Sequence, residues 1–174
     1  DAIVNGLGSG QPLGITKSTA YVSQAKETSQ TADTINGFNI SKMLGRVIEG
    51  PGANLVWLIN PDAYNQIITM TLNNNPVWTS PQGGFKEAPS GLLLGRPILK
   101  TDTLQTLGDK FDIILANMSG YQAITKAGAA EMATSMHLWF DQDMTAFRLI
   151  FRMDGKPILS GPVTPPNSAI TRAH

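Results

Sequence analysis

The sequence predicts an α+β domain in which a mixed or antiparallel sheet packs against two or three helices. A short apolar run at residues 55–59 ends at an Asn-Pro pair that opens a helical pattern, and a second helical pattern covers residues 39–49. The second half of the chain carries several stretches of strand type separated by turn residues. Because strands and helices do not alternate strictly, we expect α+β rather than a doubly wound fold.

Residues 1–15 have the composition of a loop, with four glycines and one proline close together. A glycine-rich phosphate-binding loop would need a helix that opens at its last glycine. Pro12 and Gly14 oppose such a helix. We therefore expect a crossover loop here, without a phosphate site.

Residues 39–49 have the pattern of an amphipathic helix. Its apolar residues are spaced to share one face: Ile40, Met43, Leu44, Val47 and Ile48. Asn39 is the expected N-cap, and the Gly-Pro-Gly sequence at residues 50–52 ends the helix. Residues 19–25 are rich in β-forming side chains and are expected to form a short strand before it.

The stretch from residue 53 to residue 70 is the strongest structural signal in the chain. Residues 55–59 are apolar without interruption, as expected of a short strand buried on both faces. Asn60 is placed to cap a helix that Pro61 opens, and Asp62 lies favourably in its first turn. The apolar stripe of this helix contains Tyr64, Ile67 and Ile68.

Residues 72–95 form the longest irregular segment, and loops of this length commonly have a function. The segment carries Trp78 and Phe85, two aromatic side chains in polar surroundings. Two interpretations remain open. The loop folds over the core of its own domain, or it packs on a neighbouring subunit.

Most of the chain beyond this loop is expected to be strand. Residues 96–101 form a short strand in which Pro97 indicates an edge position, and residues 112–117 form a buried one. Residues 121–126 alternate as a strand with one solvated face does. The Asp-Gly pair at residues 154–155 predicts a turn.

Two longer alternating stretches, residues 131–140 and residues 144–153, predict an antiparallel pair around a turn at residues 141–143. In the second stretch, alternation places Arg148 and Arg152 on one face of the strand. These arginines can bind phosphate, although carboxylates of a neighbouring subunit fit them better.

Composition limits the classes of function. The 174 residues suffice for one domain with a core or for two small ones, and the sequence has no Cys and no run of about 20 apolar residues for a membrane span. Charged residues make up 15%, against a usual value of about 25%, so the surface is expected to consist of Ser, Thr, Asn, Gln and Gly or to be covered in part by other protein. The 13 basic and 13 acidic residues balance, which disfavours sequence-specific nucleic-acid binding. The start at Asp1 without a methionine indicates a fragment or a processed product.

Few residues have the pattern of a catalytic or metal site, and we expect no catalytic, cofactor-binding or metal-binding residues. His137 lies in a stretch of strand type without a second ligand nearby, and Asp141 and Asp143 fit a turn. A small hydrolase using His137 with one of these carboxylates is one alternative function. A monomeric ligand-binding module with a concave apolar pocket is another.

Four stretches together resemble the major capsid proteins of tailed bacteriophages with the Hong Kong phage-type fold, which encapsulins share. They are a loop of the form N-G-x-G-x-x-x-P-x-G-I, a strand-to-helix N-P corner, a V-W followed by L-L-G-R-P-I, and a late A-F-R strand. In this chain they occupy residues 5–15, 57–64, 77–78 with 92–98, and 146–155. Their order and spacing cover nearly the whole chain.

The resemblance implies the C-terminal portion of such a protein, divided into four parts. Residues 1–15 would be the entry loop, 16–130 the axial domain, 131–160 the strands returning to the peripheral domain, and 161–174 a loose tail. The family's N-terminal arm, extended loop and spine helix would precede the entry loop.

The resemblance also implies a structural subunit that assembles into the pentamers and hexamers of an icosahedral phage or prophage shell. Such a shell encloses packaged DNA without reading its sequence, without cofactors and without a membrane. The subunit would reside in the virion capsid, after assembly in the host cytoplasm. An encapsulin-like shell protein is the nearest alternative. The candidate subunit-interface residues are Trp78, Phe85, Lys86, Arg148 and Arg152.

Overall fold

The computed structural model describes residues 1–50, 52–72, 75–76, 78–79 and 91–165. The helices are α1 (Ala2–Asn5), α2 (Gly37–Arg46) and α3 (Pro61–Thr69), with 3₁₀ turns η1 (Ile15–Lys17), η2 (Met118–Gly120) and η3 (Phe140–Gln142). The strands are β1 (Leu55–Ile59), β2 (Thr71–Leu72), β3 (Asn75–Pro76), β4 (Trp78–Thr79), β5 (Leu92–Leu93), β6 (Arg96–Lys100), β7 (Ile113–Asn117), β8 (Tyr121–Trp139) and β9 (Met144–Pro157).

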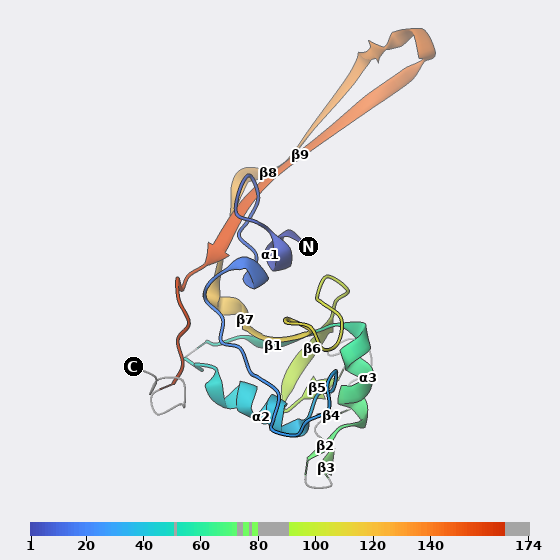
Figure 1. Ribbon diagram of the computed structural model, residues 1–174. Helices are drawn as coiled ribbons and strands as arrows, with labels where there is room; N and C mark the ends of the chain where they lie inside the picture. The colour runs from blue at the N-terminus through green and yellow to red at the C-terminus, as the bar shows by residue number, and fades with distance from the viewer. Residues whose placement is uncertain (51, 73–74, 77, 80–90, 166–174) are drawn as a thin grey trace.

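Five strands form a mixed sheet in the order β4-β5-β6-β1-β7, and α2 and α3 lie beside it in the body (Figure 1). β1 pairs in parallel with β6, and the other neighbours pair antiparallel. Two separate antiparallel pairs, β2 with β3 and β8 with β9, complete the strands. The predicted α+β class is therefore confirmed.

The predicted strand, corner and helix around Asn60 are confirmed with the expected boundaries. β1 is buried at four of its five positions. The Asn60 side chain accepts a hydrogen bond from the backbone N–H of Asp62 at 2.9 Å, and Pro61 occupies the first turn of α3. The cap and the proline both act within a few residues, so the local sequence suffices to define this corner.

The core has two parts, one on each face of the sheet. α2 and α3 cover one face, where Trp57 is fully buried and its indole N–H donates to the backbone carbonyl of Leu93 at 3.0 Å. Leu104 and side chains from the first fifteen residues cover the other face, against Leu58 and Ala116. Burial on both faces explains why β1 is apolar throughout.

Helix α2 begins earlier than predicted. Asn36 is the N-cap, and its side chain accepts from the N–H of Phe38 at 3.2 Å. Asn39, the predicted cap, instead lies inside the helix, where its side-chain oxygen accepts from the N–H of Asn36 at 2.9 Å. The two asparagines form a reciprocal capping box, so both carry capping signals and only the first one starts the helix.

Two further strand predictions are wrong. Residues 19–25 form no regular structure, although their composition favours a strand. β6 is not an edge strand, because it lies between β5 and β1. Pro97 fits there because the pairing with β1 starts only at Ile98, so its missing N–H costs no bond in that ladder.

The predicted turn at residues 154–155 is also wrong, because both residues lie inside β9. Gly155 is buried, and a Cβ atom on it would come within 2.8 Å of the Tyr121 ring. The Tyr121 hydroxyl donates to the backbone carbonyl of Leu13 at 3.1 Å, which holds the ring in place. Glycine therefore serves close packing at this position and not chain reversal.

None of the helices described here has the length and apolar character needed to cross a membrane. The proposed division of the chain into four parts stays a prediction. β8 runs without a break across the expected boundary between residues 130 and 131.

Candidate assembly surfaces

The most prominent surface is a two-stranded ribbon, formed by β8 and β9, that extends away from the body (Figure 1). Its register runs from Tyr121 opposite Pro157 at the base to Trp139 opposite Met144 at the tip. The predicted antiparallel pair is thus confirmed, and it begins ten residues earlier than predicted. An isolated pair of strands is marginally stable in water, so this ribbon is expected to need a partner surface.

One face of the ribbon is apolar and exposed. Phe147, Leu149 and Phe151 alternate along β9, and Met132 lies directly opposite Leu149 on β8. The exposed fractions are 74% for Phe147, 69% for Leu149 and 73% for Met132. Contiguous exposed apolar side chains of this size mark sites of protein contact.

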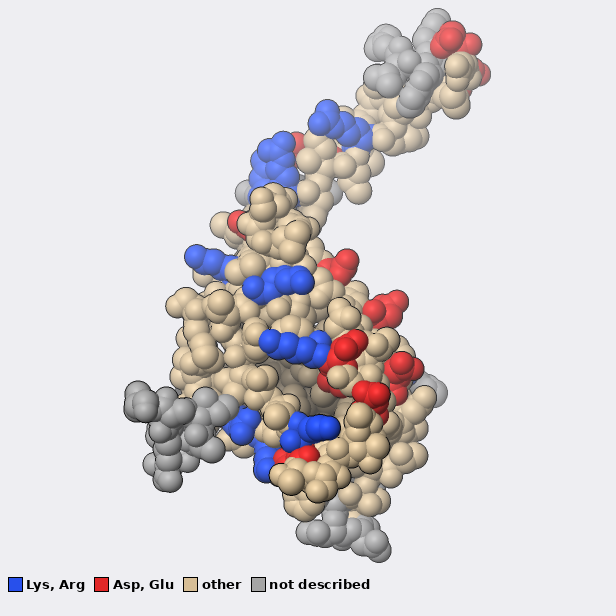
Figure 2. Space-filling model, viewed as in Figure 1, with Lys and Arg blue, Asp and Glu red and all other residues tan. Residues whose placement is uncertain are grey.

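The opposite face of β9 carries three basic side chains and one acidic side chain, Asp154. Arg148, Arg152 and Lys156 follow one another at intervals of four residues, which places them on one face of a continuous strand. All three are exposed, and within the described chain neither arginine has an ion-pair partner. Figure 2 shows Lys and Arg gathered along the ribbon and down one side of the body, with Asp and Glu gathered beside them. The ribbon therefore presents two faces of different chemistry.

The other interface candidates lie elsewhere. Trp78 is in β4, opposite Leu93 of β5, and packs partly buried against the core beneath α2 and α3. β4 is at the far end of the body from the ribbon (Figure 1), so Trp78 is not brought together with Arg148 and Arg152. Phe85 and Lys86 lie outside the described residues.

The three candidate catalytic residues of the alternative hydrolase function lie near the ribbon tip. Asp141 lies in η3 and Asp143 follows it, and both are exposed. His137 belongs to β8, and its side chain lies outside the description. None of the three lines the hollow that lies beside β7. Among the described residues, no group of three His, Cys, Asp or Glu side chains is placed to hold a metal ion.

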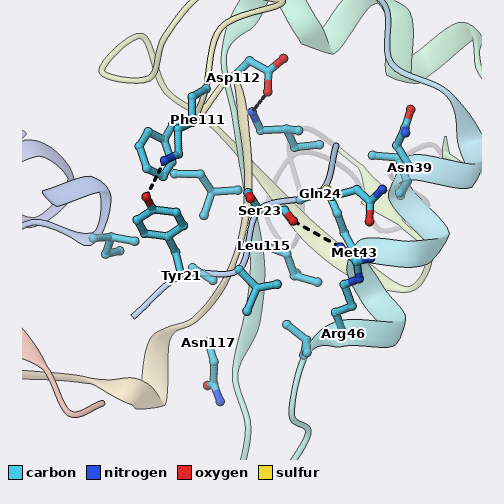
Figure 3. A pocket seen from close by; sticks show the side chains of 18 of the residues that line it. Tyr21, Ser23, Gln24, Asn39, Met43, Arg46, Phe111, Asp112, Leu115 and Asn117 are labelled. Atoms are coloured by element: carbon cyan, nitrogen blue, oxygen red, sulfur yellow. Dashed lines mark hydrogen bonds between the residues drawn. The ribbon is translucent and has the colours of Figure 1, made fainter. Parts of the chain in front are cut away.

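A second surface is a partly open hollow of about 790 Å³ beside β7 (Figure 3). Its walls come from residues 20–35, α2, the stretch from Gly108 to Asn117, and the tail after the ribbon. Met43 and Leu115 lie on its inner side, and Arg46 donates to the backbone carbonyl of Ser23 at 3.2 Å on its rim.

Aromatic and charged groups close one end of the hollow. Tyr21 and Phe111 meet edge to face with ring centroids 5.1 Å apart, and Lys110 lies over both rings while it bonds the Tyr21 hydroxyl. Burial raises the pKa of the neighbouring Asp112 carboxyl. Hydrogen bonds from the backbone N–H groups of Gly108 and Ile113 oppose this rise in pKa. Contacts among Tyr21, Lys110 and Phe111 therefore hold the side chains in place at this end of the hollow.

The sequence signals for these two surfaces differ. The alternation of Phe147, Leu149 and Phe151 is visible in the sequence, but it does not say whether the apolar face is covered by the same domain. The hollow has no sequence signal, because residues 20–35 and Asp112 meet only through the fold.

Comparisons with known proteins agree with the fold. The sequence matches the phage capsid family over residues 1–167. No curated protein matches it. A solved chain described as "Capsid of empty GTA particle computed with C5 symmetry" is similar in structure, with a TM-score of 0.62 and 15% sequence identity. The similarity covers 88% of this chain and 55% of that one, so this chain spans about half of the length of that capsid protein. The family match extends over almost the entire sequence, and the chain belongs to the phage capsid family.

Proposed function

We propose that this chain is a structural subunit of a tailed-phage or prophage capsid, and that copies of it join as pentamers and hexamers in an icosahedral shell. The shell encloses packaged DNA, and no residue of this chain reads its sequence. The subunit has no enzymatic activity. It assembles in the host cytoplasm and remains in the virion.

The exposed apolar face of the ribbon carries this proposal. Phe147, Leu149 and Met132 are each more than two-thirds exposed, although burying a side chain of this size is worth about 1.5–3 kcal/mol. A member of the phage capsid family that exposes such a face gains this free energy when other protein covers it. Assembly is the process that supplies the cover.

The interface candidates have different roles in this proposal. Arg148 and Arg152, which lack ion-pair partners among the described residues, meet carboxylates of neighbouring subunits. Trp78 packs against its own core. Phe85 and Lys86, which lie outside the described residues, are proposed to contact neighbouring subunits near the centre of the ring. Head-to-tail contacts of this kind close into rings when the rotation between subunits fits.

Electron microscopy of the expressed protein tests the proposal directly. Closed shells, or rings of five and six subunits, are the expected result. A monomer at every salt concentration and pH would instead favour a ligand-binding module that uses the hollow.

Two double variants locate the contacts. Phe147→Ser with Leu149→Ser removes the apolar face, and Arg148→Ser with Arg152→Ser removes charges from the opposite face of the same strand. The first is expected to abolish shells, and the second is expected to weaken them in a salt-dependent way. Shells that tolerate the first variant would show that the ribbon face is not a contact. An encapsulin-like shell is the alternative that forms similar particles, and measuring the DNA content of the particles separates the two.

A further inference from the structure

The outer edge of β7 has free hydrogen-bonding groups. β7 is an end strand of the five-stranded sheet and pairs only with β1. The N–H of Met118 donates to the carbonyl of Asn54, and the carbonyl of Asp112 accepts from the N–H of Asn60. Since antiparallel pairing alternates along a strand, the even-numbered residues of β7 face β1 and the odd-numbered ones face outward.

Three odd-numbered residues therefore point their backbone groups away from the sheet: Ile113, Leu115 and Asn117. The outward N–H of Ile113 donates to the Asp112 side chain at 2.8 Å. The N–H and carbonyl of Leu115 and the N–H of Asn117 have no hydrogen-bond partner in the described part of the chain. An unpaired edge of this kind is a template for another strand.

The hollow lies along this edge. All residues from Ile113 to Asn117 line it, although successive side chains of a strand point to opposite faces. Five consecutive lining residues fit a hollow that runs beside the strand edge. At about 3.3 Å per residue, β7 offers roughly 17 Å of edge to an occupant.

The facing wall also has free backbone groups. Residues 21–24 line the hollow, and none of the N–H groups of residues 21–25 has a hydrogen-bond partner among the described residues. The side-chain oxygen of Gln24, on the same wall, is buried without a partner. Tyr21, Phe111 and Leu115 add apolar surface between these two rows of polar groups.

We propose that the hollow receives an extended peptide strand from another copy of this chain, which adds to the outer edge of β7. An extended backbone has donors and acceptors along both of its edges and side chains at alternate positions, which suits an unpaired strand edge. The choice of a second copy rests on the proposed function, because assembly places other copies at each subunit's surface. The described tail of the same copy already forms part of the wall through Leu159 and Val163.

Hydrogen exchange, resolved to single residues by mass spectrometry, tests the edge. Unassembled subunits and assembled particles are separated by sedimentation and compared. The amides of Leu115 and Asn117 are expected to exchange at least about 100-fold more slowly in particles. The amides of Ile114 and Ala116, which face β1, serve as internal controls and should be slow in both states. Particles in which Leu115 and Asn117 remain fast would overturn the proposal and leave the proposed function intact.

Photo-cross-linking identifies the occupant. Benzoylphenylalanine replaces Val22, which lines the hollow, or Leu99, an exposed residue of β6 outside it, in mixtures of light and ¹⁵N-labelled subunits. Particles labelled at Val22 should give mixed light–heavy cross-links to one short segment, and the Leu99 control should not reach that segment. Cross-links confined to a single copy, including those to residues 166–174, would refute a strand from a second copy. Failure to form particles would count against the proposed function itself.

Discussion

Replacing Asn60 by alanine tests how one side chain joins helix α3 to the rest of the core. Its oxygen accepts from the N–H of Asp62 at 2.9 Å, and its amide nitrogen donates to the backbone carbonyl of Leu104 at 2.9 Å. The second bond is buried, and Asn60 itself is 8% exposed. Alanine removes both bonds and leaves the Leu104 carbonyl buried without a donor.

The expected loss of stability is the sum of two effects. Losing an N-cap costs about 1 kcal/mol, and an unsatisfied buried carbonyl costs about 1–3 kcal/mol more. We therefore expect Asn60→Ala to lower the free energy of unfolding by about 2–4 kcal/mol. Asn36 is a matched control, because it caps α2 through the N–H of Phe38 and is exposed. Asn36→Ala should cost only about 0.5–1 kcal/mol.

Urea unfolding followed by tryptophan fluorescence measures both variants, provided that the slope of free energy against denaturant is unchanged. Aspartate gives a sharper comparison. Asn36→Asp keeps the capping oxygen at an exposed site and should be close to neutral. Asn60→Asp also keeps that oxygen, but it removes the donor to Leu104 and should destabilise. If Asn60→Ala cost no more than Asn36→Ala, the buried bond would contribute nothing and the reasoning would be wrong.

Three further predictions concern packing and charge. Ile67→Ala should cost about 2–5 kcal/mol in urea unfolding because Ile67 is fully buried, whereas Ile68→Ala, at a site 37% exposed, should cost less than about 1 kcal/mol. Gly155→Ala places a Cβ within 2.8 Å of the Tyr121 ring and should speed proteolysis at the ribbon base, whereas Gly120→Ala meets no atom within 4 Å and should not. Burial raises the pKa of Asp112 above its usual 3.8, so the folded state holds this proton more tightly than the unfolded state. The wild type should therefore lose stability relative to Asp112→Asn as the pH rises from 3.8 through the folded pKa, and an unchanged difference in unfolding free energy would contradict this.

Local signals account for the parts of the fold that the sequence predicts correctly. The apolar run of β1, the cap at Asn60 and the proline after it act within a few residues, and together they predict a single local structure. The errors arise where a local signal has two structural uses. Asn36 and Asn39 both carry capping signals, and Gly155 can serve a turn or a close contact. For Gly155, the choice depends on the position of the Tyr121 ring, which is more than thirty residues away in the sequence.

The candidate surfaces show a second limit of sequence reasoning. Alternation along β9 defines the face that carries Phe147 and the face that carries Arg148, but burial depends on what lies opposite. The free edge of β7 is harder still to predict, because it depends on strand order, and β7 has the same apolar sequence as a central strand would have. Trp78 is a different case, since the sequence places it in a long irregular segment, whereas in the structure it lies in β4 and packs against its own core.

In the proposed assembly, the ribbon face and the β7 edge have different roles. Apolar contact is non-directional, so the face carrying Phe147 and Leu149 supplies free energy but allows a partner to shift along the ribbon. Strand addition is directional, because a slip of one residue reverses which side chains face the core. A ring closes only when the rotation between subunits has a fixed value. In the proposed assembly, a strand held by backbone hydrogen bonds at the edge near Leu115 would set that rotation, and the apolar ribbon face would add free energy of contact.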